Sequence, residues 1–526
     1  MDRKWWTLIV VCGATFMLLL DVTIVIVALP EIQAGLHATF ADVQWVIDAY
    51  ALTLASLLLT AGSLADRYGR RLLFAIGLAI FTVGSLTCGL AQSPLMLIIS
   101  RSVQGVGGAI MFATSLALLA NSFRGKDRGV AFGVWGAITG VAVALGPVLG
   151  GIITSYINWR GIFLVNIPIG IAAIAITLWK VDESKTPEAS RPDWAGFVLL
   201  TAGLVSLVYG LIRASEISWS DTGVKICLAL AVVFLGAFVW AELRATRPMF
   251  DLALFRVPTF SGGLMAAFCM NGSLYALLLY LVLYLQDDLG YSALATGVRL
   301  LLLSGATLIA ATAAGRLSTY MPVRWLIGPG LALVGLGLFL MSGIGGTSSW
   351  THLAPGFIVA GFGSGMVNPP LASTAVGVVR PERSGMASGV NTTFRQIGIA
   401  VGIAAYGTIF TASIRNSLGH SLSGVSGLAS KTPQIISGIQ QGNVGAVIKG
   451  APASARGQVV SAIHSSFTGA LNDLLVVSGI LALVGAVGAL SLIRSKDFVA
   501  QQQGPPPAAA GPGAPVQPMV PAGSET

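Results

Sequence analysis

Charged side chains are scarce in this sequence. Only 10% of its 526 residues are Asp, Glu, Lys or Arg, whereas 55% are hydrophobic. Because about a quarter of the residues in a soluble protein are charged, this composition predicts an integral membrane protein. We attribute the formal net charge of +9 to basic loops on the cytoplasmic side of a membrane and expect no nucleic-acid partner.

Cysteine and histidine are also rare. The four cysteines lie inside apolar runs without CxxC spacing, which argues against a disulfide framework or a metal site; they are Cys12, Cys88, Cys227 and Cys269. The four histidines lie in predicted loops or at span edges, so an imidazole relay through the membrane is not expected; they are His37, His352, His420 and His464. The chain has no HExxH motif and no Walker phosphate loop. Intramembrane hydrolysis and ATP-driven pumping therefore have no support, and we expect neither a metal nor a cofactor.

Long apolar runs are abundant instead. A membrane-spanning helix needs roughly 20 mostly apolar residues, and the chain offers fourteen such runs, at 5–29, 43–62, 71–91, 95–119, 130–156, 161–181, 194–213, 222–242, 259–284, 291–314, 324–343, 351–378, 387–413 and 468–493. No small-residue cleavage site follows the first run, so we expect a span there and no cleaved signal peptide.

The distribution of Lys and Arg predicts the orientation. An even number of spans puts both termini on one side, and the termini and the loops on that side carry twenty basic residues. The opposite loops carry six, of which four lie in the long loop 414–466, where the positive-inside rule is weak. We therefore expect a multi-pass protein of the cell membrane with cytoplasmic N- and C-termini.

Two halves of the sequence repeat. The segments "QGVGGA" (Gln104–Ala109) and "AGFGSG" (Ala360–Gly365) share glycines at an offset of 256 residues, and "GVAFGV" (Gly129–Val134) and "GMASGV" (Gly385–Val390) repeat at the same offset. Spans 4 and 5 thus correspond to spans 12 and 13. Repeated helical bundles are a transporter architecture with a substrate site near the membrane midplane.

The repeat predicts an all-α membrane fold of two six-helix bundles with two inserted helices. The expected divisions are an N-terminal bundle (1–181), a linker with the inserted helices (182–258), a C-terminal bundle (259–493) that includes an external loop (414–466), and a disordered cytoplasmic tail (494–526). The low-complexity sequence of the tail is typical of disorder.

Three segments have a distinctive pattern of charge, glycine and proline. "GSLADRYGRR" (Gly62–Arg71) lies between spans 2 and 3, where Gly62 would allow close helix packing and Asp66 would be an anionic partner for the basic residues around it. "RSVQGVGGA" places Arg101 inside span 4, where a buried arginine needs a partner. "ALGPVLGG" places Pro147 inside span 5, where proline removes a backbone hydrogen bond and predicts a kink.

These segments resemble the signature motifs of the major facilitator superfamily. "LDVTIVIVALP" (Leu20–Pro30) and "WRGIFLVNIPIG" (Trp159–Gly170) are similar to motifs of its fourteen-span drug:proton antiporters, and "WVIDAY" (Trp45–Tyr50) is similar to the exporters of quaternary ammonium compounds. The chain departs from the usual motifs at Ala142, Ile26 and Thr319. The resemblance implies an alternating-access bundle that exports lipophilic, often cationic compounds in exchange for protons. It also implies a set of residues that control the conformational change: Gly62, Asp66, Arg67, Gly69, Arg70, Gly105, Gly146, Pro147, Gly150 and Gly151.

Asp21 and Asp48 are the acids that lie well inside predicted spans. A desolvated carboxylate holds its proton, and a nearby cation or cationic substrate favours proton loss, which is the opposition that exchange of substrate for protons requires. We predict that Asp21 couples transport to protons, with Arg101 as its partner on family analogy. The alternative for Asp21 is a structural hydrogen bond that fixes the first span.

Asp48 has two interpretations. It is either a hydrated residue near the outer mouth or a deeper carboxylate for a cationic drug, with Trp45 or Tyr50 adding cation–π attraction. Three polar residues make span 13 unusually polar and are predicted to line the cavity: Asn391, Arg395 and Gln396. Trp135 completes the predicted substrate-binding set.

The leading hypothesis is a proton-driven multidrug exporter that acts as a monomer in the lipid bilayer, with small-molecule drugs or metabolites and protons as its partners. The alternative is a narrow exporter of one metabolite or antibiotic. A non-transporting membrane sensor or a membrane enzyme is less favoured, since a sensor would need no membrane acid.

Overall fold

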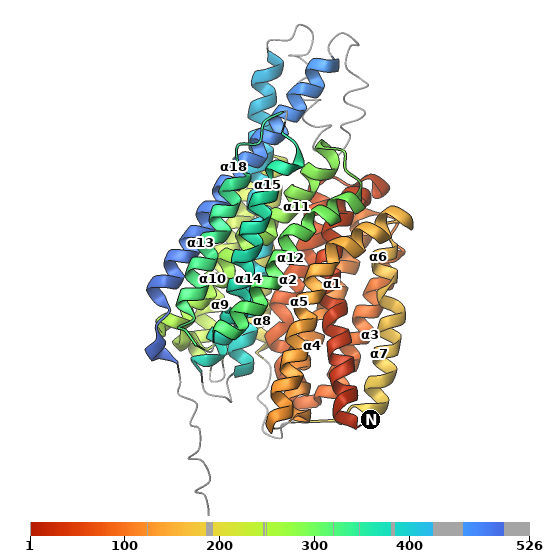
Figure 1. Ribbon diagram of the computed structural model, residues 1–526, viewed down its shortest axis with the longest axis vertical. Helices are drawn as coiled ribbons and strands as arrows, with labels where there is room; N and C mark the ends of the chain where they lie inside the picture. Colours follow the sequence, from red (N-terminus) through yellow and green to blue (C-terminus); the bar gives the residue numbers. More distant parts are fainter. Residues whose placement is uncertain are drawn as a thin grey trace, which may run out of the picture.

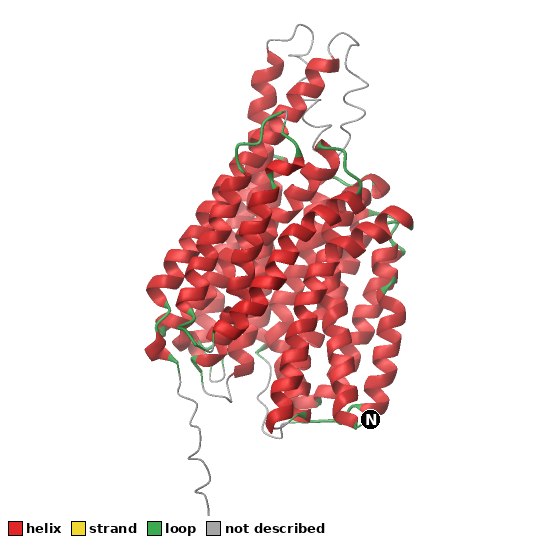
Figure 2. Ribbon diagram, viewed as in Figure 1, coloured by secondary structure: helices red, strands yellow, loops and turns green. Residues whose placement is uncertain are grey.

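The computed structural model describes residues 2–123, 125–185, 193–245, 248, 250–318, 320–346, 348–379, 384–423 and 456–498. Within these residues the chain is helical, with short connections and no strand (Figure 2). An all-helical chain is expected in a lipid bilayer, because a helix satisfies its backbone hydrogen bonds within one segment. The predicted disordered tail, 494–526, is wrong at its start, where the structure has a 3₁₀ turn at Ser495–Asp497. The tail after residue 498 and the central part of the predicted external loop, 424–455, lie outside the described residues.

The first half contains α1 (Arg3–Leu36), α2 (Phe40–Tyr68), α3 (Arg70–Gly89), α4 (Pro94–Ser122), α5 (Gly125–Tyr156), the short α6 (Gly161–Leu164) and α7 (Asn166–Lys180). The two inserted helices are α8 (Trp194–Glu216) and α9 (Thr222–Arg244). They pack on each other, and α8 also packs on α2 and α15.

The second half begins with one long span made of four pieces, which are α10 (Pro258–Met270), the π-helical turn η2 (Asn271–Tyr275), α11 (Ala276–Leu283) and the π-helical turn η3 (Tyr284–Asp288). It continues with α12 (Ala293–Leu317), α13 (Arg324–Met341), α14 (Ala354–Gly377), α15 (Ser384–Ser423) and α18 (Arg456–Leu492). Short 3₁₀ turns are η1 (Leu252–Arg256), η4 (Trp350–His352) and η7 (Ser495–Asp497).

Thirteen of the described helical segments are long and apolar enough to cross a membrane. The predicted span 351–378 is not among them, although it forms the 24-residue helix α14. This helix contains several glycines and two internal prolines, Pro369 and Pro370, which lower its hydropathy. It packs between α12 and α13, where neighbouring helices shield it.

The two halves pack in parallel ways. In the first half α4 packs on both α2 and α3, and in the second half α14 packs on both α12 and α13. Small residues make both contacts close: a Cβ atom at Gly77 of α3 would lie 3.1 Å from the carbonyl oxygen of Gly107, and one at Gly330 of α13 would lie 2.9 Å from that of Gly363. Close backbone approach at small residues is how helices associate without a hydrophobic driving force.

The two ends of the helical bundle correspond to the two ends of α1. The near end carries Arg3 and the far end carries His37 (Figure 1). The halves meet along α1–α11, α2–α15 and α5–α12. At the far end Gln286 Nε2 donates to the carbonyl oxygen of Val27 at 2.8 Å, and the backbone N–H of Leu294 donates to Ser155 Oγ at 3.1 Å. The far end is therefore closed by contacts between the halves.

The halves diverge toward the near end along α5 and α12. Ser304 Oγ donates to the carbonyl oxygen of Ala144 at 3.1 Å, and a Cβ atom at Gly140 would meet Leu308 at 3.2 Å. Closer to the near end of the bundle, a Cβ atom at Gly136 of α5 or at Gly315 of α12 would meet nothing within 4 Å.

Several predicted boundaries are wrong because the helices continue past the apolar runs. The predicted loop 414–466 begins and ends as helix, since α15 extends to Ser423 and α18 starts at Arg456. These extensions form a helical pair beyond the far end (Figure 2). Leu418 and Val459 are fully buried there, and Ser466 Oγ donates to Ser417 Oγ at 3.0 Å. Hydropathy identifies only the apolar part of a helix and not the polar turns that continue it.

Candidate functional site

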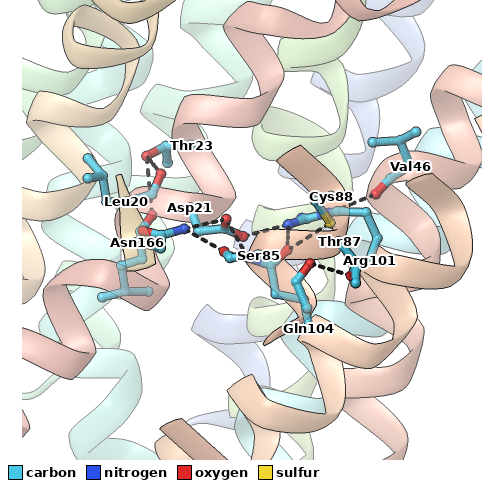
Figure 3. A network of polar contacts seen from close by, with 12 residues as sticks. Leu20, Asp21, Thr23, Val46, Ser85, Thr87, Cys88, Arg101, Gln104 and Asn166 are labelled. Carbon is cyan, nitrogen blue, oxygen red and sulfur yellow. Dashed lines mark hydrogen bonds and ion pairs between the residues drawn. The ribbon is translucent and has the colours of Figure 1, made fainter. Parts of the chain in front are cut away.

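A buried ion pair lies in the middle of the first half. Asp21 of α1 and Arg101 of α4 are 1% exposed, and Arg101 Nη1 donates to Asp21 Oδ2 at 2.5 Å (Figure 3). The sequence-based pairing of these two residues is thus found in the structure. Arg101 would be costly in the bilayer without such a partner, and the contact ties α1 to α4.

Neutral side chains complete this network. Asp21 Oδ1 accepts hydrogen bonds from Gln104 Nε2 at 2.8 Å and Asn166 Nδ2 at 3.3 Å, and both donors also reach Ser85 Oγ (Figure 3). Sequence reasoning did not select Gln104, Asn166 or Ser85. The signal was present, because Gln104 and Asn166 lie inside the quoted segments "RSVQGVGGA" and "WRGIFLVNIPIG".

Arg101 also contacts α2. Its Nε donates to the carbonyl oxygen of Val46 at 3.2 Å, and its guanidinium lies 4.3 Å from the centre of the Tyr50 ring. Tyr50 therefore makes a cation–π contact with a protein cation, and its buried hydroxyl has no hydrogen-bond partner. Tyr50 itself is 2% exposed.

Asp48 lies in the protein interior and not at a hydrated mouth. Its side chain is 0% exposed, and neither carboxylate oxygen has a hydrogen-bond partner. One turn before it on α2, Gln44 Nε2 donates to Tyr280 Oη and to the carbonyl oxygen of Ile403, both at 3.1 Å, which links the two halves. Asp48 thus lies one turn from a contact between the halves, with its own hydrogen-bonding capacity unused.

A small cavity of about 30 Å³ lies between the halves. Its lining includes Thr23 of α1, Pro147 of α5, Tyr275 of η2 and Ser304 of α12. Trp135, a predicted substrate contact, is half-buried on α5 and donates its Nε1 to Thr15 Oγ1 at 3.0 Å, which joins α5 to α1.

The polar residues predicted on span 13 lie on α15. Arg395 donates to Asn391 Oδ1 at 3.2 Å and to Asn368 Oδ1 of α14 at 3.1 Å. Arg395 and Gln396 are partly exposed, whereas Asn391 is 4% exposed. Asn368 was not selected from the sequence, because it lies in a glycine- and proline-rich run without charge.

The loop motif between α2 and α3 forms a braced turn at the near end. Arg70 pairs with Asp66 at 2.8 Å, and Arg67 lies 5.7 Å from the Tyr68 ring centre. Gly69 has φ +124°, a conformation that L side chains rarely adopt. The expected close packing at Gly62 is wrong for this conformation, since a Cβ atom there would meet nothing within 4 Å.

Glu183, at the start of the predicted linker, caps this turn. Its carboxylate accepts from the backbone N–H groups of Arg71 at 3.0 Å and Leu72 at 3.1 Å, two of the unpaired donors at the start of α3. The residue before it, Asp182, pairs with Arg3 at 2.5 Å. The start of this segment is thus attached to the bundle, while residues 186–192 lie outside the described part.

The glycines of α4 and α5 mark close helix contacts. A Cβ atom at Gly105 would lie 2.8 Å from the carbonyl oxygen of Tyr50, one at Gly150 would lie 2.8 Å from that of Ile24, and one at Gly146 would overlap Thr23. Gly151 faces the other half, where a Cβ atom would lie 2.7 Å from the carbonyl oxygen of Ala293. Helix α5 continues through Pro147 without ending.

The family model of the Major Facilitator Superfamily matches residues 11–403. The chain belongs to this superfamily. Similar proteins include the multidrug resistance protein Stp of Mycobacterium tuberculosis (strain CDC 1551 / Oshkosh), which is 36% identical over 78% of this chain and 77% of its own length. The tetracenomycin C resistance and export protein of Streptomyces glaucescens is 33% identical over 96% of this chain and 95% of its own.

Solved structures support the same fold. The bacterial homolog of the human lysosomal transporter Spinster, in an inward-facing and occupied conformation, covers 95% of this chain and 99% of its own with a TM-score of 0.63 at 17% identity. Tetrameric PepTSo2 covers 93% of this chain and 98% of its own with a TM-score of 0.59 at 14% identity. At these identities the likeness concerns the fold alone. The expected major facilitator fold is therefore confirmed.

Proposed function

We propose that the chain is a proton-coupled antiporter that exports lipophilic small molecules from the cytoplasm by alternating access. It belongs to the major facilitator superfamily, and two of its relatives are named for multidrug resistance and for resistance to and export of tetracenomycin C. The near end, which carries both termini of the described chain, is taken as the cytoplasmic side on the distribution of Lys and Arg. The protein acts as a monomer without a cofactor, driven by the proton gradient.

One observation supports the proposed proton coupling: of the two membrane acids of the first half, one has hydrogen-bond donors and a counter-charge around it and the other has neither. Asp21 accepts hydrogen bonds on both oxygens, one of them from the cation Arg101. Asp48 has no donor on either oxygen and is fully buried, so ionisation there would be costly. We therefore assign the exchanged proton to Asp48, the acid without a hydrogen-bond partner, whereas Asp21 is already paired with Arg101.

Substrate exchange follows from this difference. The divergence of α5 and α12 toward the near end leaves a path to the midplane from the cytoplasmic side. When a cationic part of a substrate approaches Asp48, it favours proton loss. Once Asp48 has lost its proton, its carboxylate can bind the cationic part of the substrate. After the far end opens, Asp48 takes up a proton again, which favours release of the substrate.

The test uses purified chain in proteoliposomes with an imposed pH gradient. Fluorescent dye should be driven against its concentration gradient only when the pH difference is present, and the collapse of that difference by an ionophore should stop transport. Dye movement that is indifferent to the pH gradient would contradict proton coupling.

A narrow exporter is the second candidate. Relatives are named for single compounds, such as the puromycin resistance protein pur8 of Streptomyces alboniger, which is 35% identical over 78% of this chain. A panel of dyes, biocides and antibiotics in the same proteoliposomes separates the two: transport of one chemical scaffold favours the narrow exporter, and transport of many favours multidrug export.

A further inference from the structure

A polar cluster lies in the second half, between α14, α15 and η2. Arg395 Nε donates to Asn391 Oδ1 at 3.2 Å, and its Nη1 donates to Asn368 Oδ1 at 3.1 Å. Asn368 Nδ2 in turn reaches Tyr275 Oη at 3.5 Å, and that hydroxyl lies 3.3 Å from Ser364 Oγ. Tyr275 also lines the cavity between the halves, so the cluster adjoins the interface between them.

The cluster has a positive charge without a counter-charge. The acceptors of Arg395 are the Oδ1 atoms of Asn391 and Asn368 and the carbonyl oxygen of Asn368, all neutral. Among the residues that the structure describes, no carboxylate lies within 4.0 Å of its guanidinium. Arg101 in the first half, by contrast, has Asp21. An uncompensated arginine at membrane depth is costly and marks a functional site.

The cluster also has a surplus of donors. Asn391 is 4% exposed, and its Nδ2 is buried without an acceptor, on the same amide whose oxygen binds Arg395. A guanidinium has five N–H donors and no acceptor, and the three acceptors around Arg395 leave part of that capacity unused. Adjacent surplus donors with a positive charge are complementary to a carboxylate or an ionised phenol.

The fold itself does not require this cluster. The offset of 256 residues between the halves assigns neutral side chains to the three equivalent positions of the first half, which are Thr139, Trp135 and Phe112. The first half packs its corresponding helices with those residues. The cation and its two amides are therefore a property of the second half alone.

The depth of the cluster argues against a lipid headgroup as the natural anion. Arg395 lies 11 residues after the start of α15 at Ser384, and Asn368 lies nine residues before the end of α14 at Gly377. At 1.5 Å per residue these positions are roughly 14–17 Å from the near end, about halfway across a hydrocarbon core of about 30 Å.

We propose that Arg395, Asn391 and Asn368 form a subsite for the anionic group of the transported compound. The substrates are lipophilic molecules with a carboxylate or an ionised phenol, including zwitterions whose cationic part faces Asp48. Arg395 and Asn368 are partly exposed, so the anion enters from their side and reaches the sealed amide of Asn391. The inference rests on the proposed export function and adds an acidic group to the features expected of the substrate.

Binding and transport by the full-length chain test the subsite. Rhodamine B has a free carboxylate, and its ethyl ester is the matched probe without it. Fluorescence anisotropy with protein in nanodiscs should show that Arg395→Gln weakens binding of the acid by at least about tenfold, the size of one charge-assisted hydrogen bond. Binding of the ester should change less than about twofold, and Arg395→Lys should retain part of the preference for the acid.

Arg299→Gln is the matched control. Arg299 of α12 lies at the far end against Tyr291 and Trp350, and its loss should leave the acid-to-ester ratio unchanged. The subsite is refuted if wild-type protein binds acid and ester equally, or if Arg395→Gln weakens both by the same factor. It is also refuted if the effect requires phosphatidylglycerol in the nanodisc, which would assign the anion to lipid.

The transport arm separates this proposal from the export function. Selective binding of the acid without pH-driven movement of either dye in proteoliposomes would support the subsite and contradict export. Movement of both dyes at equal rates, unaffected by Arg395→Gln, would support export and contradict the subsite.

Discussion

At the scale of single residues, the two membrane acids of the first half have opposite surroundings. Asp21 has a cation and two amides as partners, whereas Asp48 has none. Breaking a buried ion pair costs about 3–5 kcal/mol because one charge is left uncompensated. Removing an isolated buried acid has no such cost. Replacing the acid by its amide therefore has different consequences for stability at the two positions.

For Asp21→Asn we expect a loss of roughly 3–5 kcal/mol of stability, because Arg101 loses its counter-charge, together with loss of pH-driven transport. Thermal unfolding in detergent and proteoliposome flux measure the two effects. The double variant Asp21→Asn/Arg101→Met should recover stability without recovering transport. Undiminished pH-driven transport by Asp21→Asn would refute its coupling role.

For Asp48→Asn we expect little change in stability, because the substitution breaks no hydrogen bond of the Asp48 side chain. Substrate binding should then release no proton, and flux should no longer respond to the pH gradient. Proton release can be followed with a pH-sensitive dye in weakly buffered solution. Normal proton release by this variant would mean that Asp48 is not the carrier.

The sequence predicted part of this site for a physical reason. Asp21 and Arg101 attract attention because a charge in an apolar run is costly and needs a partner. Gln104, Asn166 and Asn368 were missed because neutral amides in such runs carry a smaller cost and have no unique partner in the sequence. Which of two acids is compensated depends on side-chain directions that only the folded chain defines.

At the scale of helices, most of the fold could be predicted from the sequence because the lipid bilayer constrains the composition of the spans. Spans are recognisable because the hydrocarbon core requires apolar side chains over a fixed length. Prediction failed where a helix is not apolar throughout. Helices α15 and α18 extend beyond the apolar runs through polar residues, and α14 has a lower hydropathy because it is rich in glycine and proline. The π-helical turns η2 and η3 have no signature in hydropathy, although such turns are frequent at functional sites.

The cap of α3 gives a prediction at this scale. Glu183→Ala removes the acceptor of two backbone N–H groups, so we expect a loss of about 0.5–2 kcal/mol, measured as a lower unfolding temperature. Asp182→Ala is the matched control. Its ion pair with Arg3 is exposed, and pairs of that kind contribute little. An equal effect of both substitutions would contradict the capping role.

At the scale of the whole molecule, the two halves are closed at the far end and diverge toward the near end along α5 and α12. The closed side relies on small residues. Gly151 of α5 leaves no room for a Cβ atom beside the backbone of Ala293 and Leu294. Alternating access requires that this contact separate and that the opposite side close.

We therefore expect Gly151→Ala to shift the population toward conformations with an open far end. Distances between spin labels on Ser155 and Leu294, which are hydrogen-bonded here, should lengthen in the variant. Gly136→Ala is the matched control, because α5 has open space at that position. If both variants leave the label distances unchanged, the far-end contact does not control the opening.

The helical pair formed by the ends of α15 and α18 has a practical consequence for imaging. Its buried Leu418 and Val459 are continuous with the hydrophobic core of the bundle, so it turns with the second half. A transporter that lies within a detergent micelle offers few features for particle alignment in electron cryomicroscopy. An antibody fragment raised against this protruding pair would supply an alignment marker, and the tilt of that marker between particle classes would report the rocking angle of the second half.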